Sequence, residues 1–185
     1  MPTRRAFAFL LASLASRPAL AQADLIERLR GGGLVVLMRH ARTEPGTGDP
    51  PGFRLDDCST QRNLDAAGRE QARAIGARLR AERVPVGRVL TSSWCRCRET
   101  AELLGVGPVE TADAIDSFFE DRSRREGQTR AARALAAAWG GPGNLVLVTH
   151  QVNVTALTGV FPASGEAVVA TPALAVLGRL PPPAG

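Results

Sequence analysis

The most informative part of the chain is Leu34-Val35-Val36-Leu37-Met38-Arg39-His40, an unbroken apolar run that ends in an arginine and a histidine. The chain has only one other histidine, His150, and it ends a similar apolar run at residues 145–149. Apolar runs of this length without alternation are typical of strands that are covered on both faces. Because ligands of open α/β sheets bind outside the carboxyl ends of the strands, we expect the two imidazoles to face one pocket.

Strand-like and helix-like segments alternate along the rest of the chain. Strands are predicted at residues 34–38, 86–91, 145–149, 167–170 and 174–177, with a short piece at Val109. Helices are predicted at residues 24–30, 65–83, 96–104, 129–139 and 152–157. This order predicts the α/β class: a single three-layer αβα sandwich with a mostly parallel central sheet. Residues 41–63 and 111–127 are predicted loops, and loops of this length are usually functional.

Composition limits the classes of function that fit. A chain of 185 residues with 44% hydrophobic residues is long enough for one domain with a substantial core. The formal charge is +5, but the arginines are interleaved with acids, and only six Phe and two Trp are available to stack on bases. These features argue against a nucleic-acid partner.

The first 23 residues are typical of an export signal. Arg4-Arg5 precedes an apolar stretch at residues 6–15, and Ala19-Leu20-Ala21 or Ala21-Gln22-Ala23 offers a cleavage site. The pair of arginines is also compatible with twin-arginine export. The apolar stretch is too short for a stable membrane anchor. We therefore expect a cleaved signal at residues 1–23, a mature domain at 24–180, a frayed tail at 181–185, and a periplasmic or secreted protein.

The chain has three cysteines, and the oxidising compartment that an exported protein enters would allow them to form a disulfide. Cys95 and Cys97 are too close for an easy bond with each other, so we expect a disulfide from Cys58 to one of them. The alternatives are a metal site, which lacks a second cysteine pair at ligand spacing, and a nucleophilic cysteine, which lacks a dedicated base.

Histidine and arginine together suit the chemistry of a phosphoryl group. A phosphate monoester is a dianion, and the planar fork of arginine binds two of its oxygens at once. A neutral imidazole is a competent nucleophile near pH 7. A histidine at a strand end is, by itself, more often structural. The occurrence of both histidines at corresponding strand ends, with Arg39 and Arg96 nearby, favours a functional site.

Four sequence motifs occur in the order found in one family. Residues 37–44 resemble the Arg-His-Gly signature of the histidine phosphatase superfamily, the phosphoglycerate-mutase-like group. Residues 91–101 are similar to its second motif, in which an arginine precedes a Thr-Ala pair, and residues 147–150 resemble its third motif, which carries the second histidine. Residues 64–72 resemble its Leu-Thr-x-x-Gly-x-x-Gln-Ala helix start. The resemblance spans roughly residues 34–159.

The resemblance implies roles for particular residues. His40 would be phosphorylated, and Arg39, Arg96 and His150 would form the phosphate pocket. Arg42 would either add a further phosphate contact or be a plain surface arginine. No metal or organic cofactor is expected. One departure is Ala41, which stands where the family usually has glycine.

The proton donor for the leaving alcohol has several candidates. Family members often carry this acid some tens of residues after the second motif. Asp116 is the first candidate, followed by Glu120 and Asp121, with Asp113 and Glu166 as outsiders. Each of these has the alternative of being a solvated loop carboxylate.

The sequence therefore predicts an exported phosphohydrolase that cleaves small phosphate monoesters through a phosphohistidine on His40. The alternatives are a phosphomutase and a non-catalytic binder of a phosphorylated envelope ligand. The oligomeric state is left open.

Overall fold

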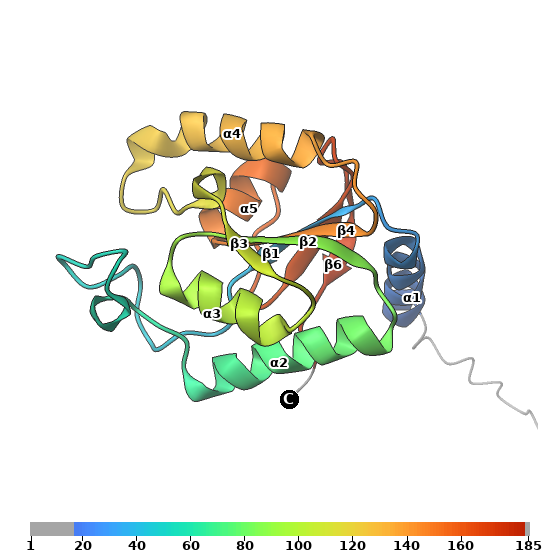
Figure 1. The fold of residues 1–185 in the computed structure, drawn as a ribbon, viewed down its shortest axis with the longest axis horizontal. Helices are drawn as coiled ribbons and strands as arrows, with labels where there is room; N and C mark the ends of the chain where they lie inside the picture. The colour runs from blue at the N-terminus through green and yellow to red at the C-terminus, as the bar shows by residue number, and fades with distance from the viewer. Residues whose placement is uncertain (1–16, 184–185) are drawn as a thin grey trace, which may run out of the picture.

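Six strands form one sheet in the order β3-β2-β4-β1-β5-β6 (Figure 1). The structure is a computed structural model that describes residues 17–183. Its strands are β1 (Val35–Arg39), β2 (Val86–Thr91), β3 (Val109–Thr111), β4 (Asn144–Thr149), β5 (Ala167–Ala170) and β6 (Val176–Leu180). Strands β1 to β4 are parallel, and β5 is antiparallel to both of its neighbours, β1 and β6. The sheet is mostly parallel, as predicted.

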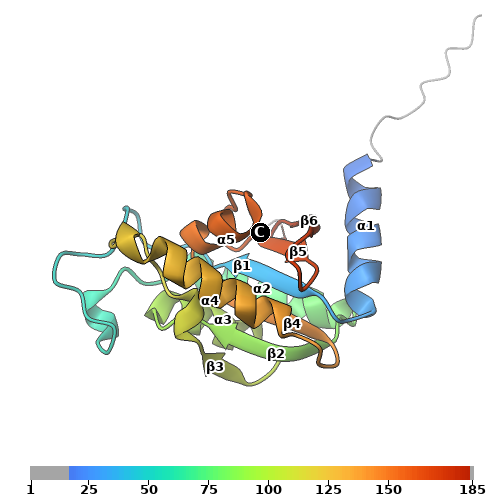
Figure 2. The ribbon, with the colours of Figure 1, turned by 90° about the horizontal axis from the view of Figure 1, so that it is seen from above.

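Helices cover both faces of the sheet. The helices are α1 (Arg17–Arg30), α2 (Ala66–Ala81), α3 (Cys95–Leu104), α4 (Arg125–Ala137) and α5 (Gln151–Thr158), with short 3-10 turns at Cys58–Thr60, Asp113–Ile115 and Arg122–Arg124. Helices α2 and α3 lie below the sheet in Figure 1 and α4 and α5 above it, and α1 packs beside β6 (Figures 1 and 2). The predicted three-layer αβα sandwich is confirmed.

The alternation of side chains along the central strands builds one apolar core on each face. Val36 and Met38 of β1 pack in the core on the side of α2 and α3, whereas Val35 and Leu37 pack on the side of α4 and α5. Every residue of β4 is buried. Because both faces are covered, these strands carry the continuous apolar runs that made them recognisable.

Close packing of α2 places the backbone that follows β1. An added Cβ at Gly68 would lie 1.9 Å from the carbonyl oxygen of Arg42, so only glycine permits this approach. Asp65 caps the helix, and its Oδ1 accepts a hydrogen bond of 2.6 Å from the backbone N–H of Gly68. The start of α2 is therefore held against the segment that leaves His40.

Three predicted boundaries were wrong. Helix α4 begins at Arg125 rather than at residue 129, and α1 begins at Arg17 rather than at Asp24, which forms an ion pair with Arg28 instead of a cap. The last strand starts at Val176, because Leu174 lies in a turn with a positive φ of 63°. Of the predicted tail, residues 184–185 lie outside the described part of the chain.

One disulfide joins Cys58 to Cys95, one of the two pairings left open by the sequence, and Cys97 is a buried free thiol. The bond uses two of the three thiols considered for a metal site. Most of the predicted export signal, residues 1–16, lies outside the described residues. Within residues 17–183, no helix combines the length and apolar character needed to cross a membrane.

Candidate active site

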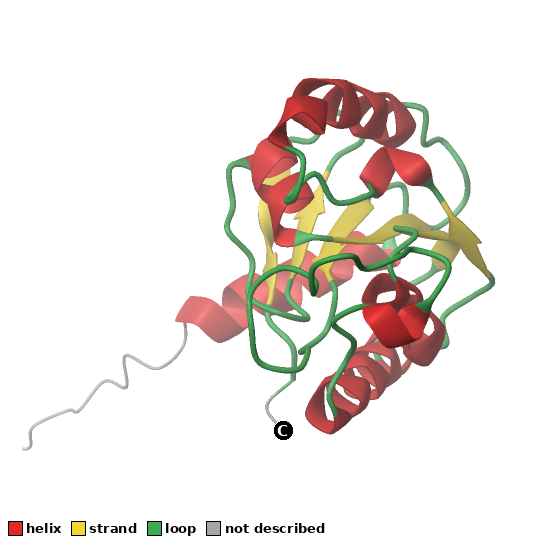
Figure 3. Cartoon of the chain, turned by 90° about the vertical axis from the view of Figure 1, so that its left-hand side faces the viewer, coloured by secondary structure: helices red, strands yellow, loops and turns green. Residues whose placement is uncertain are grey.

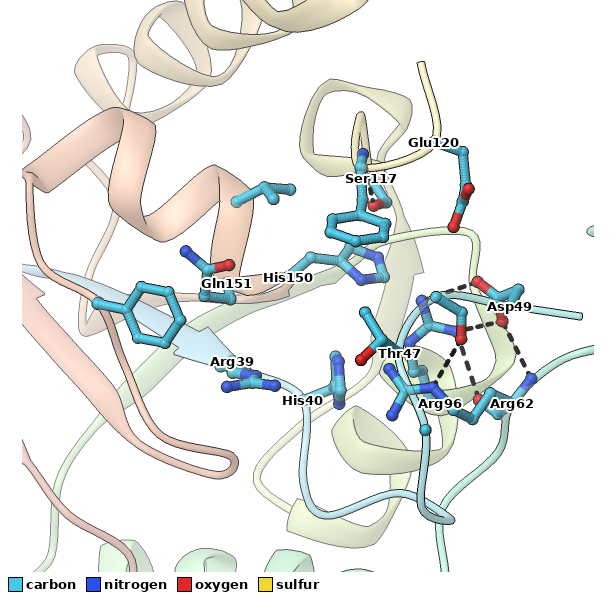
Figure 4. Close-up of a pocket in the computed structure, with 15 residues that line it drawn as sticks. Arg39, His40, Thr47, Asp49, Arg62, Arg96, Ser117, Glu120, His150 and Gln151 are labelled. Carbon is cyan, nitrogen blue, oxygen red and sulfur yellow. Dashed lines mark hydrogen bonds and ion pairs between the residues drawn. The ribbon is translucent and has the colours of Figure 1, made fainter. Parts of the chain in front are cut away.

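A cavity of about 290 Å³ lies at the carboxyl ends of the neighbouring strands β1, β4 and β2. Figure 3 views the molecule from the side on which the long loop of residues 41–63 lies, and Figure 4 shows the cavity itself. Both histidines line it, with ring centroids 5.6 Å apart. It is lined by Arg39, His40, Gly46, Thr47, Gly48, Asp49, Arg62, Arg96, Ser117, Phe119, Glu120, His150, Gln151, Val152 and Phe161.

His40 is held in one tautomer by the backbone. Its Nδ1 lies 2.8 Å from the carbonyl oxygen of Ala41, which can only accept, so Nδ1 carries the proton. Nε2 therefore has a free lone pair in the neutral ring. Burial lowers the pKa of His40 to about 3, and the positive charge of Arg96 acts in the same direction. The ring is therefore neutral at pH 7.

His150 is connected to a buried polar chain. Its Nε2 lies 2.9 Å from Oγ of Ser92, and Ser92 donates its own hydrogen to Oδ1 of Asp116 at 3.0 Å. The Ser92 oxygen thus accepts from Nε2–H of His150. Burial, followed by the charge of Arg96, lowers the pKa of His150 well below its usual value. The edge of Trp94 packs against the imidazole, with ring centroids 5.2 Å apart.

Asp116, the first candidate for the proton donor, lies behind the cavity wall rather than in it. Its Oδ1 accepts hydrogen bonds from Ser92 and from the backbone N–H of Ser93, and Oδ2 accepts from Oγ of Ser93. It is buried and does not line the cavity. Its hydrogen bonds hold Ser92, which contacts His150, and its carboxylate does not face the cavity.

Among the carboxylates considered from sequence, Glu120 is the one that lines the cavity. It is exposed, and Figure 4 shows it at the edge of the group of residues that line the cavity. Asp121 instead caps the turn at Arg122–Arg124 by accepting from the backbone N–H of Ser123. Glu166 forms an ion pair with Arg179, and Asp113 does not line the cavity.

Three arginines converge on the cavity. Arg39 donates through Nη1 to the carbonyl oxygen of Pro162 at 3.1 Å, while its buried Nε has no partner among residues 17–183. Arg62 was missed by the sequence analysis, because it stands at the end of a loop and outside every motif. Burial lowers the pKa of both Arg39 and Arg62, and the charge of Arg96 contributes in each case. This crowding of positive charge favours a bound anion.

Arg42 does not join this group. Its Nε donates to Asp65 at 2.7 Å on the surface, and its side chain is 63% exposed. The chain turns after His40, where the backbone N–H of Ala41 donates to Oγ1 of Thr100, and this turn directs Arg42 toward α2. Arg42 therefore lies outside the cavity as a surface arginine, and the structure does not place it where it would contact the phosphate. Ala41 itself is accommodated, fully buried against Leu64 and Ala72.

Asp49 is a second residue that the sequence analysis missed. Its carboxylate forms an ion pair of 2.7 Å with Arg96, and both side chains are at most 4% exposed. Burial alone raises the pKa of Asp49, but its contacts with Arg96 outweigh burial and lower it overall. Asp49 therefore remains ionised.

Helix ends add to the positive potential of the cavity. Helix α3 begins at Cys95, directly before Arg96, and α5 begins at Gln151, directly after His150. The N-terminal ends of helices carry partial positive charge and unpaired backbone N–H groups, which favour anions. Within residues 17–183, no group of three or more His, Cys, Asp or Glu side chains is arranged to hold a metal ion.

Several solved structures share this fold. TTHB049 from Thermus thermophilus superposes with a TM-score of 0.57 at 20% identity, over 80% of this chain and 98% of that chain. The protein histidine phosphatase SixA, complexed with tungstate, superposes with a TM-score of 0.53 at 18% identity, over 75% and 87% of the two chains. A mycobacterial glucosyl-3-phosphoglycerate phosphatase gives a TM-score of 0.53 at 19% identity, over 75% and 89%. At these identities the likeness shows the fold alone.

Comparison with curated protein sequences finds no match. The sequence model of the histidine phosphatase superfamily (branch 1) does match, over residues 35–139. The match begins with the strand that delivers Arg39 and His40 and includes Arg96, so it covers much of the cavity described above. More than half of the chain is matched, and the chain belongs to the histidine phosphatase superfamily, branch 1.

Proposed function

We propose that this protein hydrolyses phosphate monoesters through a phosphohistidine formed on Nε2 of His40. One observation carries the proposal: the bond from Nδ1 to the Ala41 carbonyl leaves the Nε2 lone pair free in a cavity that also contains three arginines. Membership of the superfamily, and the fold shared with two phosphatases, support phosphoryl transfer in general.

In the first step, Nε2 of His40 attacks phosphorus as the bond to the ester oxygen breaks. Arg39, Arg62 and Arg96 balance the negative charge on the non-bridging oxygens, which is the main requirement of phosphoryl transfer. His150 lies across the cavity from His40 and takes up a position beside those oxygens. The chain from Asp116 through Ser92 stabilises positive charge on His150 when the dianion is bound.

The leaving alkoxide needs a proton, and we assign this role to Glu120. It is the candidate acid that lines the cavity, and its exposure gives it access to solvent protons. In the second step, water attacks phosphorus of the phosphohistidine, inorganic phosphate leaves, and neutral His40 is regenerated. The same carboxylate, now deprotonated, accepts a proton from that water.

The cavity is larger than a phosphate group and accepts part of the leaving group. Phe119 and Phe161 line its mouth, and Phe161 is 67% exposed. These rings favour an organic leaving group with an apolar face, while Gln151 offers a polar contact beside them. A small phosphorylated molecule is therefore the proposed substrate.

The test is turnover of a generic aryl phosphate by the full chain and by His40→Ala. Loss of phosphate release in the variant, together with acid-labile phosphate on His40 of the quenched parent, supports the proposal. Binding without turnover in the parent indicates a non-catalytic phosphate binder. Transfer of phosphate between positions of a sugar, with little release, indicates a phosphomutase.

We further propose that the protein acts in the periplasm or outside the cell, after removal of residues 1–23. The Cys58–Cys95 disulfide supports this location, because stable disulfides are typical of oxidising compartments. Cleavage after Ala23 leaves Leu25, Ile26 and Leu29 of α1, which are buried in the core. Mass measurement of the protein recovered from cell fractions tests both the location and the cleavage site.

A further inference from the structure

Asp49 places a carboxylate directly on an arginine of the proposed phosphate pocket. It comes from the loop of residues 41–63, far in sequence from the arginine it contacts, Arg96 on α3. Its Oδ1 accepts from the backbone N–H of Arg62 at 3.0 Å, and its Oδ2 accepts from Nε1 of Trp94 at 3.0 Å. Each oxygen also accepts a hydrogen bond from Arg96, so two N–H donors contact each oxygen of the carboxylate.

The contacts of Arg96 can be counted donor by donor, because a guanidinium has five N–H groups. Nη1 donates to Oδ1 of Asp49 at 2.7 Å and to the carbonyl oxygen of Arg62 at 3.3 Å. Nη2 donates to Oδ2 of Asp49 at 3.1 Å. These three bonds occupy the end of the guanidinium and leave the Nε–H and the second Nη2–H.

The two remaining N–H groups lie on one edge of the planar guanidinium and point the same way. The Nε atom is buried and has no hydrogen-bond partner within the described residues. A buried donor without a partner is costly, so it marks a place where a ligand is expected. An edge with two parallel N–H groups matches two oxygens of a phosphoryl group.

We propose that Asp49 is a positioning residue, which holds the end of Arg96 so that its Nε–Nη2 edge faces two oxygens of the phosphoryl group. This proposal rests on the function proposed above and deepens it. The same carboxylate orients Trp94, whose ring packs against His150. One loop carboxylate thus orders groups on both sides of the phosphate.

The carboxylate occupies one edge of Arg96 and leaves the Nε–Nη2 edge without a hydrogen-bond partner among residues 17–183. It is therefore not a substitute for the phosphate, although both are anions. If it competed with phosphate for Arg96, its removal would strengthen phosphate binding and raise activity. The positioning role requires the opposite result.

A double-mutant cycle tests the proposal in the full chain. We compare the parent, Asp49→Asn, Arg96→Ala and the double variant, measuring kcat/KM for an aryl phosphate and the affinity for inorganic phosphate. Asp49→Asn is expected to lower kcat/KM by roughly 10- to 100-fold, as misplacement of a catalytic contact by about 1 Å does. In the Arg96→Ala background the same change is expected to have little further effect, because Asp49 acts through Arg96.

Asp57→Asn is the matched control. Asp57 lies on the same loop, accepts from Arg54 at 2.7 Å and from the backbone N–H of Ser59, and does not line the cavity. It is expected to leave kcat/KM and phosphate affinity unchanged. An equal loss in both aspartate variants would show a role in loop stability alone and would overturn the proposal.

Asp49→Ala provides a second measurement that does not depend on the asparagine variant. Formate is small enough to replace the missing carboxylate, and it is expected to restore activity several-fold when chloride at equal ionic strength does not. Equal activity in Asp49→Asn and the parent, higher activity in the variant, or equal fold-losses in both Arg96 backgrounds would each overturn the proposal. If the parent shows no turnover but its phosphate affinity is coupled between Asp49 and Arg96, the proposed hydrolysis fails while the positioning role stands.

Discussion

At the scale of single residues, the site is organised by what each polar atom is bonded to. His40 and His150 have the same side chain, but one ring uses Nδ1 against a backbone carbonyl and the other uses Nε2 against Ser92. The two imidazoles therefore present different nitrogens to the cavity. In the mechanism proposed above, Nε2 of His40 is the nucleophile, and His150, whose Nε2 is bonded to Ser92, supports the phosphoryl oxygens.

The same reasoning separates neighbouring carboxylates. Asp116 uses its hydrogen-bonding capacity on Ser92 and Ser93, whereas Glu120 faces the cavity. Glu120→Gln is expected to lower kcat for an alkyl phosphate by about 100-fold or more, because general acid catalysis contributes about 10²–10⁴. An aryl phosphate with a good leaving group is expected to lose far less.

Asp121→Asn is the control for this prediction. Asp121 is the adjacent carboxylate, is exposed, and caps a turn instead of lining the cavity. Steady-state kinetics of both variants with the alkyl and the aryl phosphate measure the difference in kcat. Equal losses for the alkyl and the aryl ester in Glu120→Gln would remove Glu120 from the role of proton donor.

Burial of two neutral imidazoles also makes stability depend on pH. The folded pKa of His40 is about 3, and that of His150 is likewise lowered, while an unfolded histidine titrates near pH 6.5. The unfolded chain therefore binds more protons below pH 6.5, and the free energy of unfolding falls as the pH drops from 6.5 toward 3. His40 contributes a slope of up to about 1.4 kcal/mol per pH unit in this window, and His150 adds a contribution of the same sign.

His40→Asn is expected to remove one such slope. Asparagine does not titrate, and its amide N–H can still donate to the Ala41 carbonyl. Denaturant unfolding at pH 7, 5.5 and 4 measures the difference between parent and variant, in which the contribution of the carboxylates cancels. A variant whose free energy of unfolding falls as steeply as that of the parent would contradict a buried neutral His40.

At the scale of elements, the close contact between α2 and α3 depends on a glycine, Gly76, which has no side chain. An added Cβ at Gly76 would lie 1.8 Å from the carbonyl oxygen of Leu104, at the end of α3. Gly76→Ala is expected to lower the free energy of unfolding by about 1–3 kcal/mol, the usual cost of overpacking. Thermal or denaturant unfolding measures this loss.

Gly127→Ala is the matched helical control. Gly127 lies in α4, and an added Cβ there meets nothing within 4 Å. Its replacement by alanine is expected to stabilise the protein by about 0.5–1 kcal/mol, because alanine is the better helix former. Similar effects of the two substitutions would show that helix propensity, and not the approach of α2 to α3, governs both positions.

The elements that could be predicted from the sequence are those with a strong local signal. Strands β1 and β4 are buried on both faces, so they appear as apolar runs. The first turn of α4, Arg125-Glu126-Gly127-Gln128, carries no apolar period and was missed for that reason. Leu174 is apolar but lies in a turn, so its side chain suggested a strand that begins two residues later.

The residues of the site likewise divide into those with a local sequence signal and those without one. Residues that directly follow apolar strands, such as His40 and His150, could be placed at the cavity from sequence. Asp49 and Arg62 could not, because their positions depend on the path of a long loop and on contacts with Arg96 on a distant helix. Asp116 and Glu120 are four positions apart, and only the path of the backbone between them decides which one faces the cavity.

At the scale of the whole molecule, two of the attachments between the loop of residues 41–63 and the sandwich lie at the start of α3, beside the site. The Asp49–Arg96 ion pair is one, and the Cys58–Cys95 disulfide is the other. Cys95 is the first residue of α3 and immediately precedes Arg96. The disulfide therefore fixes the loop to the first turn of α3, which also carries Arg96, the arginine proposed to bind the phosphoryl group.

Replacing both Cys58 and Cys95 by alanine is expected to lower the free energy of unfolding by about 2–4 kcal/mol, since the bond closes a loop of 37 residues. The loss of the attachment is also expected to raise KM for an aryl phosphate, because Arg96 and Asp49 are then aligned less of the time. Denaturant unfolding and steady-state kinetics, with and without reductant, measure both effects.

Cys97→Ala is the control for the loss of a thiol. The Cys97 thiol is fully buried, burial raises its pKa to about 12, and it forms no disulfide. A reductant that leaves the parent as stable as before, or a double alanine variant with unchanged KM, would show that the loop keeps its place without the bond.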